Sequence, residues 1–150
     1  MLEPLAGLGP GVFIPLVPAP KLSLPLDTVK VSAGFPSPAA DYEESRLDIN
    51  EYLVRNPVST FFFPVQGDSM EGAEIHDGDI LVVDKSVRAR HGHIVIAFID
   101  GLRLVKRLHH RAGRVALMAE NPCYPPLEIQ DGMELHIWGV VIGKFKRFGA

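Results

Sequence analysis

From about position 60 onward, apolar residues come in short runs, separated by breaks that contain glycine and aspartate. Runs of this length between turn residues are typical of β-strands. They predict approximate strands at 60–65, 80–84, 93–99, 102–108, 114–119 and 134–146. Asp-Gly pairs at 77–78, 100–101 and 131–132 indicate turns, and the pair at 100–101 indicates a tight hairpin. We therefore expect a mainly β protein with a curled, mostly antiparallel β-sheet domain.

The chain has a different character before about residue 40. Residues 1–40 are rich in proline and show neither a helical period nor a sustained strand pattern. A segment of this kind is typical of an arm with extended pieces rather than of a domain. We therefore predict a flexible N-terminal arm at 1–40 and a β domain at 41–150.

Two short elements are predicted outside the strand-rich region. The alternation of Val29, Val31 and Ala33 suits a short strand within the arm, which the glycine and proline that follow would end. A helix from about Ile49 to Arg55 is also expected, because Asp48 can cap its first turn.

Composition and charge limit the possible partners and compartments. The net charge is −3 with acidic and basic residues interspersed, so strong direct DNA binding is not expected, although a local basic patch remains possible. The single cysteine, Cys123, excludes an internal disulfide and fits a reducing cytoplasm. The apolar N-terminus has no basic residue before Lys21 and is interrupted by prolines. We therefore expect a cytoplasmic protein without a membrane anchor.

Ser69 is the first candidate for chemistry. It follows the apolar run at 61–65, within the break Gly67-Asp68-Ser69-Met70. A serine at such a break is exposed and close to free backbone N–H groups, which could stabilise an oxyanion. Taken alone, the position is better explained by a cap, since Asp68 with Glu71 three residues later resembles a capping box.

Lys106 is the second candidate. Within "GLRLVKRLH" it falls on the strand face that also carries Leu102, Leu104 and Leu108. Burial there would lower the lysine pKa, and a fall from about 10.4 to roughly 7–8 would make it a general base. The alternative is a lysine that snorkels to solvent at the strand edge. A serine and such a lysine together form a known nucleophile–base pair.

Other residues with reactive side chains are weaker candidates. A turn explains Asp77 and Asp79 on either side of Gly78 better than a metal or acid–base pair does. The histidine pairs lack a third metal ligand at a convincing spacing. Cys123 has no base nearby in the sequence, so it is not expected to be reactive. The Phe61–Phe63 run is more typical of a core than of a surface that stacks on nucleic-acid bases. Neither a metal nor a cofactor is therefore expected. The histidines concerned are His91, His93, His109 and His110.

Several ordered motifs together carry a family resemblance. "GDSM" with Ser69, then "DGDILVVD", then "HGHIVIAFIDGLRLVKRL" with Lys106 resemble the self-cleaving Ser-Lys domain of LexA-type repressors. The segments "AGFPSPAADYEESRLDINEYL" and "WGVVIGKFK" are similar to those of the UmuD-like members, accessory subunits of an error-prone bacterial DNA polymerase. The resemblance runs from about residue 30 to the end, so residues 1–28 lie outside it.

The resemblance implies a catalytic site. It assigns Ser69 as the nucleophile and neutral Lys106, 37 residues later, as its base. It also places the cleaved bond between Ala33 and Gly34, two small residues that let the backbone approach a serine closely. The alternation around that bond suits docking as an added strand. The implied fold is the β-rich one shared by LexA and signal peptidases.

The resemblance also implies a biological role in the SOS response to DNA damage. Contact with the RecA–single-stranded-DNA filament would stimulate self-cleavage. The product, residues 34–150, would form a homodimer and join a Y-family DNA polymerase catalytic subunit for mutagenic translesion synthesis.

Other functions remain open at this stage. A LexA-like self-cleaving transcriptional regulator would need a helix-turn-helix domain, which residues 1–40 cannot supply. A signal peptidase would need a membrane anchor. A non-catalytic protein-binding module, with Ser69 and Lys106 in structural roles, is the alternative from a different class.

Overall fold

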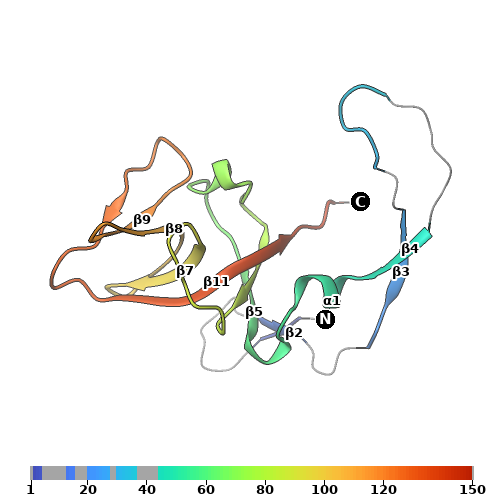
Figure 1. The fold of residues 1–150 in the computed structure, drawn as a ribbon, viewed down its shortest axis with the longest axis horizontal. Coiled ribbons are helices and arrows are strands. Elements are labelled where there is room, and N and C mark those ends of the chain that lie inside the picture. The colour runs from blue at the N-terminus through green and yellow to red at the C-terminus, as the bar shows by residue number, and fades with distance from the viewer. Residues whose placement is uncertain (1, 5–12, 16–19, 28–29, 37–43, 150) are drawn as a thin grey trace.

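The computed structural model describes residues 2–4, 13–15, 20–27, 30–36 and 44–149 (Figure 1). The described elements are almost all strands, with one short α-helix and two 3-10 turns. In chain order they are β1 (Leu2–Pro4), β2 (Phe13–Pro15), β3 (Ser23–Asp27), β4 (Glu44–Asp48), α1 (Ile49–Leu53), η1 (Pro57–Ser59), β5 (Thr60–Pro64), η2 (Glu71–Ala73), β6 (Ile80–Asp84), β7 (Ile94–Ile99), β8 (Leu102–Arg111), β9 (Arg114–Met118), β10 (Leu127–Glu128) and β11 (Leu135–Phe145).

Most of these strands form one antiparallel sheet, in the order β1-β2-β5-β6-β11-β7-β8-β9-β10, and β3 and β4 form a separate pair. The long strand β11 lies between β6 and β7, and its register shifts against each of them, between Val141 and Gly143 and between Ile137 and Gly139. Such bulges bend a strand and increase its twist. The prediction of a mainly β fold of the LexA type with antiparallel strands is therefore confirmed.

The local signals for strands and turns agree closely with the structure. The predicted strands match β5, β6, β7, β8, β9 and β11, although β8 continues to Arg111 instead of ending at 108. Asp100 and Gly101 both adopt positive φ, 47° and 81°, between β7 and β8. Two such residues make the primed turn that matches the twist of paired strands.

The predicted helix forms, but it is shorter than expected. α1 begins after Asp48, whose carboxylate accepts hydrogen bonds from the N–H groups of Asn50 and Glu51. It ends at Leu53, not at Arg55, because Val54 already has an extended backbone.

The predicted strand around Val31 and Ala33 is wrong for the described residues. Residues 30–36 contain no strand, and Ala33 lies in a bend. The strand of this region is β3, which pairs with β4 from Ser23↔Asp48 to Asp27↔Glu44. Alternating side chains alone did not create a strand, because this stretch has no partner strand. Val29, part of the same prediction, lies outside the described residues.

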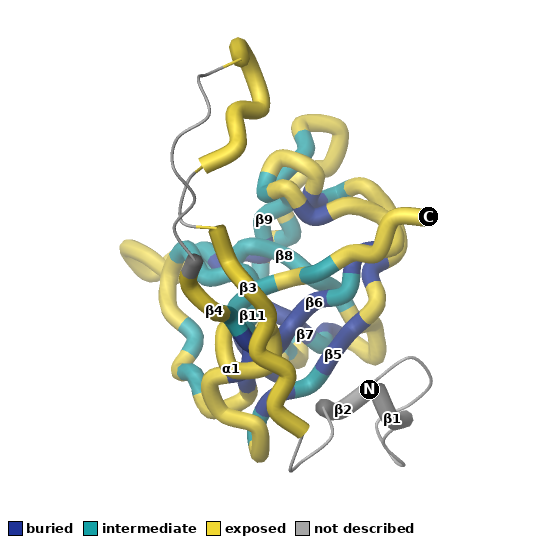
Figure 2. Tube along the Cα trace, turned by 90° about the vertical axis from the view of Figure 1, so that its right-hand side faces the viewer, coloured by how far each residue is buried: buried dark blue, intermediate teal, exposed yellow. Residues whose placement is uncertain are grey.

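Buried residues gather in the strands of the main sheet (Figure 2). Because successive side chains of a strand point to opposite faces, the core occupies both faces of this sheet. Val95 belongs to one cluster and its neighbour Ile96 to the other. Phe61 and Phe63 each meet Trp138 edge to face, with ring centroids 4.9 Å apart. The phenylalanine run is therefore part of the core packing.

Candidate active site

Ser69 lies in the loop that joins β5 to β6. Backbone hydrogen bonds from Val65 N to Asp79 O (2.8 Å) and from Gly78 N to Val65 O (2.9 Å) close the neck of this loop. Met70, directly after the serine, is buried in the core cluster that contains Phe63 and Trp138. The apolar methionine therefore anchors the loop and leaves Ser69 half-buried at its surface.

The segment after β9 also forms hydrogen bonds with the loop that carries Ser69. Glu120 N donates to Ser69 O (2.9 Å), and Gly72 N donates to Glu120 O (2.7 Å). Asn121 Nδ2 donates to the carbonyl oxygen of Asp68 (3.0 Å). A Cβ on Gly72 would lie 2.6 Å from Glu120 O, so only glycine fits this contact. Sequence reasoning missed these positions, because their hydrogen bonds join loops far apart along the chain.

Lys106 approaches Ser69 from β8. Its Nζ lies 2.6 Å from Ser69 Oγ and 3.1 Å from its neighbour's carbonyl, Val105 O. Across the β7–β8 ladder Lys106 pairs with Val95, which has no exposed surface. Burial of the ammonium group lowers the pKa of Lys106. The structure thus brings together the two residues that the sequence singled out, and the desolvation expected for the lysine is present.

The capping explanation for the Ser69 region does not hold. The 3-10 turn η2 starts after Met70 and has no side-chain cap. The Asp68 carboxylate instead accepts a hydrogen bond from Tyr124 Oη. Among the described residues, the backbone N–H groups of Ser69 and Met70 have no acceptor. Donors without a partner beside a serine are what an oxyanion site requires.

Of the weaker candidates, Asp77 and Asp79 have structural roles. Asp77 accepts a hydrogen bond from Gly67 N (2.8 Å) within the Ser69 loop. Asp79 is buried and forms an ion pair with Lys144 (2.9 Å). Within the described part of the chain, no three His, Cys, Asp or Glu side chains are arranged to hold a metal ion. Cys123 is an exposed free thiol.

The structure does not bring the expected cleavage bond to Ser69. Ala33 and Gly34 lie in the described segment 30–36, between β3 and β4 in the chain, and this segment stands away from the main sheet in both overall views (Figures 1 and 2). Both residues are exposed, and a Cβ built on Gly34 meets no atom within 4 Å. In this conformation the bond is exposed, and its segment stands apart from the sheet whose strand β8 carries Lys106.

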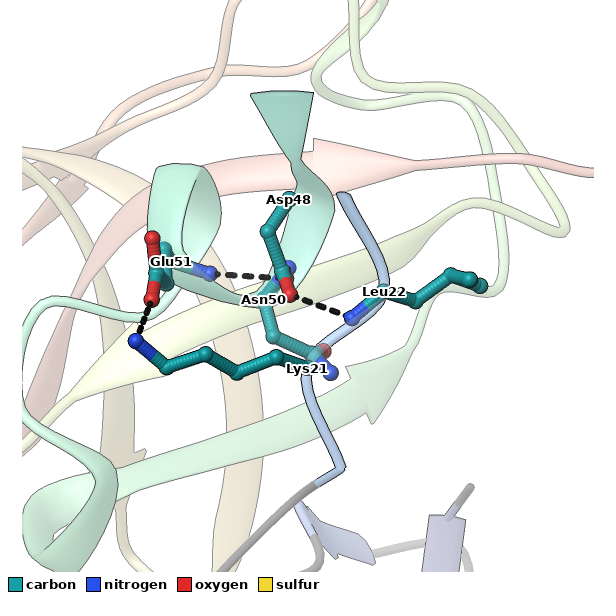
Figure 3. Close-up of polar contacts among 5 residues, drawn as sticks. All are labelled: Lys21, Leu22, Asp48, Asn50 and Glu51. Atoms are coloured by element: carbon teal, nitrogen blue, oxygen red, sulfur yellow. Dashed lines mark hydrogen bonds and ion pairs between the residues drawn. The ribbon is translucent and has the colours of Figure 1, made fainter. Parts of the chain in front are cut away.

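Polar contacts hold the chain just before β3 against the start of α1 (Figure 3). Leu22 N donates to Asp48 Oδ2 (2.7 Å), and Lys21 Nζ forms an ion pair with Glu51 (3.0 Å). The Leu22 hydrogen bond is the main reason why the pKa of Asp48 is lowered. Asp48 therefore has two roles, since its other oxygen caps α1. We call this group, Lys21, Leu22, Asp48 and Glu51, the arm clamp.

Comparison with protein families supplies the classification. The family model for Peptidase S24-like proteins matches residues 25–142, most of the chain. The chain belongs to the Peptidase S24-like family. The match spans both Ser69 and Lys106 as well as the expected cleavage bond.

Curated relatives narrow this classification. The Peptidase S24-like chain is 49% identical to protein MucA of Salmonella typhimurium over 120 residues, 79% of this chain and 82% of the relative. It is 50% identical to protein SamA of the Salmonella typhimurium LT2 strain over 117 residues, 78% and 81% of the two chains. It is also 37% identical to LexA repressor 2 of Geobacter sulfurreducens over 129 residues, 85% of this chain and 62% of that repressor.

MucA and SamA are UmuD-like SOS mutagenesis proteins, so the expected UmuD-like identity within the Peptidase S24-like family is confirmed. The relatives support a role in SOS mutagenesis, and the family supports a self-cleaving serine peptidase in general terms. Among the described residues, no helix is both long and apolar enough to cross a membrane.

Proposed function

We propose that this protein cleaves its own chain between Ala33 and Gly34, with Ser69 as nucleophile and Lys106 as general base. The observation that carries this proposal is the 2.6 Å contact between Lys106 Nζ and Ser69 Oγ. A hydroxyl becomes an effective nucleophile when a base takes its proton. Burial lowers the pKa of Lys106, which favours the neutral amine that such a base requires.

The reaction has two steps, formation of an ester on Ser69 and hydrolysis of that ester. Neutral Lys106 accepts the Oγ proton while Ser69 Oγ attacks the carbonyl carbon of Ala33, and the backbone N–H groups of Ser69 and Met70 receive the oxyanion. The intermediate collapses, the bond to Gly34 N breaks, and Lys106 returns its proton to the departing amine. Water then attacks the ester carbon while neutral Lys106 accepts a proton from that water. The bond to Ser69 Oγ breaks, Lys106 returns the proton to Oγ, and the carboxylate of Ala33 is released.

The reaction requires a change of conformation. Because the bond stands away from Ser69, the segment 30–36 has to move into the site before the serine can attack it. The RecA–single-stranded-DNA filament would bind the cleavable arrangement more tightly than the resting one. Such binding would shift the population of the chain toward the cleavable arrangement. Self-cleavage would then be linked to DNA damage, which agrees with the SOS mutagenesis role of the relatives.

The product of the cut would be residues 34–150. This product retains β4 to β11, with Ser69 and Lys106, and loses β1 to β3. We propose that it forms a homodimer in the cytoplasm and joins a Y-family DNA polymerase catalytic subunit for translesion synthesis. The similarity to the SOS mutagenesis proteins MucA and SamA supports this assignment.

The decisive test is incubation of the purified protein, both with RecA filaments on single-stranded DNA and alone at alkaline pH, followed by mass determination of the fragments. Two fragments that meet between Ala33 and Gly34 are expected from the parent, and none from Ser69→Ala. Ser45→Ala, which removes an exposed hydroxyl elsewhere, should be cut like the parent. Cleavage of Ser69→Ala at this bond would exclude Ser69 as nucleophile.

A LexA-like self-cleaving regulator is the second candidate, because the chain is 37% identical to a LexA repressor. Such a regulator would cleave itself by the same chemistry, but it would act by binding duplex DNA instead of a polymerase. Sequence-specific binding to duplex DNA would favour it, whereas binding of the cleaved product to a Y-family polymerase would favour the role in translesion synthesis. An uncleaved parent under both conditions would favour the non-catalytic binding module.

A further inference from the structure

An apolar hollow of about 410 Å³ lies beside the Ser69 loop. It is lined mainly by apolar side chains from the end of β9 and the segment that follows. The main lining residues are Gly72, Met118, Ala119, Pro122, Tyr124 and Pro126. Proline and tyrosine rings offer flat apolar surfaces, which suit an aromatic or large aliphatic side chain.

The hollow and the nucleophile share the same backbone contacts. Glu120, another lining residue, donates its N–H to Ser69 O and accepts the N–H of Gly72. Asn121, also in the lining, binds the carbonyl of Asp68. A side chain seated in the hollow is therefore held at a defined position relative to Ser69 Oγ.

The segment that carries the cleavage bond has a side chain suited to this hollow. Phe35, the residue directly after Gly34, is 93% exposed and the bulkiest side chain in residues 30–36. An aromatic ring so exposed gains from any apolar site that it reaches when the bond moves to Ser69. Since a residue spans at most about 3.6 Å of chain, Phe35 stays close to the serine when the bond is being cut.

A second hollow offers a less suitable environment. It has a volume of about 310 Å³, and its lining includes the polar side chains of Gln66 and Arg103. A phenyl ring there would cover polar groups without satisfying them. The polar side chains of the first hollow already have partners, since Glu120 pairs with Arg107 and Asn121 donates to Asp68 O. The first hollow is therefore the better site for Phe35.

We propose that the hollow beside the Ser69 loop is the subsite that receives the Phe35 side chain during self-cleavage. Phe35 is then a specificity-determining residue that aligns the Ala33–Gly34 bond with Ser69 Oγ. This inference rests on the proposed self-cleavage. It adds that the site recognises the aromatic side chain directly after the cleaved bond.

The first experiment compares self-cleavage rates at alkaline pH for the parent, Phe35→Ala and Phe35→Leu. Phe35→Ala should slow cleavage by at least about tenfold, because the apolar contact is lost in the cleavable arrangement. Phe35→Leu, which can still fill the hollow, should stay within about threefold of the parent. Phe148→Ala is the matched control, since Phe148 is also exposed, at 80%, and lies near the C-terminus.

The second experiment does not depend on cleavage. A photoreactive benzophenone side chain replaces Phe35 in the Ser69→Ala variant, which is irradiated under the cleaving conditions and mapped by mass spectrometry. Cross-links to Met118, Tyr124 or Pro126 are expected. A Phe35→Ala rate equal to that of Phe148→Ala, with the parent cleaved, would overturn the subsite and leave self-cleavage intact. Cross-links confined to other surfaces would overturn the assignment of the hollow as the Phe35 subsite, even if the parent were never cleaved.

Discussion

Lys106 lies opposite Val95 across the β7–β8 ladder, and Val95 has no exposed surface. This pairing puts a basic side chain next to the core, and the desolvation lowers the pKa of Lys106. The lysine Nζ meets Ser69 Oγ at 2.6 Å from this position. The sheet register therefore favours the neutral amine that the proposed reaction needs.

Lys106→Ala should abolish cleavage near neutral pH, because Ser69 loses its base. Stability should respond to pH in a defined direction. Since the folded pKa is lowered, the unfolded chain binds more protons between that pKa and about 10.5, so the parent gains stability as pH rises through this window. The alanine variant should lack this gain, which denaturant melts at several pH values will measure.

The exposed Lys30 provides the control for these melts, and Lys30→Ala should retain the pH-dependent gain of the parent. If Lys106→Ala also retains it, Lys106 is a solvated structural lysine and its assignment as base fails. The cleavage rate of the parent should rise with pH, with a midpoint below the ordinary lysine pKa of about 10.4.

Gly34→Val should block cleavage without disturbing the fold. In the described conformation a side chain at Gly34 meets no atom within 4 Å, so the resting structure tolerates it. In the cleavable arrangement, a β-branched side chain next to the scissile carbonyl would hold the backbone away from Ser69. Gel analysis at alkaline pH measures the effect, with Gly149→Val as control at another open glycine. Cleavage of Gly34→Val at the parent's rate would show that the bond lies elsewhere.

Leu22→Pro should open the arm clamp, because proline removes the N–H group that donates to Asp48 Oδ2. Leu22→Ala retains this donor and is the matched control. The backbone amides of β3 and β4 should exchange with solvent faster in the proline variant than in the alanine variant. The pKa of Asp48 in the proline variant, measured by NMR titration, should rise toward the ordinary carboxyl value.

The clamp should also depend on pH in the parent. The pKa of Asp48 is lowered in the fold, chiefly by the Leu22 N–H, so its contribution is present above about pH 3.9 and is lost as pH falls through the folded pKa. Equal amide exchange rates in β3 and β4 of the proline and alanine variants would mean that this hydrogen bond does not hold the segment before β3.

Gly72→Ala should distort the Ser69 loop. The added methyl group would lie 2.6 Å from Glu120 O, a backbone atom that cannot move away freely. Overpacking of this kind destabilises a fold by about 1–3 kcal/mol. Denaturant melts and cleavage assays should both show a loss, whereas Gly149→Ala should resemble the parent. An unchanged cleavage rate would show that the Glu120 contact does not position Ser69.

Local patterns were sufficient for most of the strands. Apolar runs and turn residues are read over a few positions, and the Asp100-Gly101 hairpin needs only two residues that accept positive φ. Capping of α1 by Asp48 is likewise a contact between near neighbours. The choice of Ser69 and Lys106 came from the alternation of side chains in one strand and from ordered motifs along the chain.

The surroundings of these two residues depend on contacts that no local pattern contains. The bonds from the segment after β9 to the Ser69 loop join residues about fifty positions apart, and the Leu22–Asp48 bond joins residues 26 positions apart. Alternation around Val31 predicted a strand, but β4 pairs with β3 instead. A strand, a buried lysine or a hollow exists only when a distant segment supplies its partner, and that choice is made by packing of the whole chain.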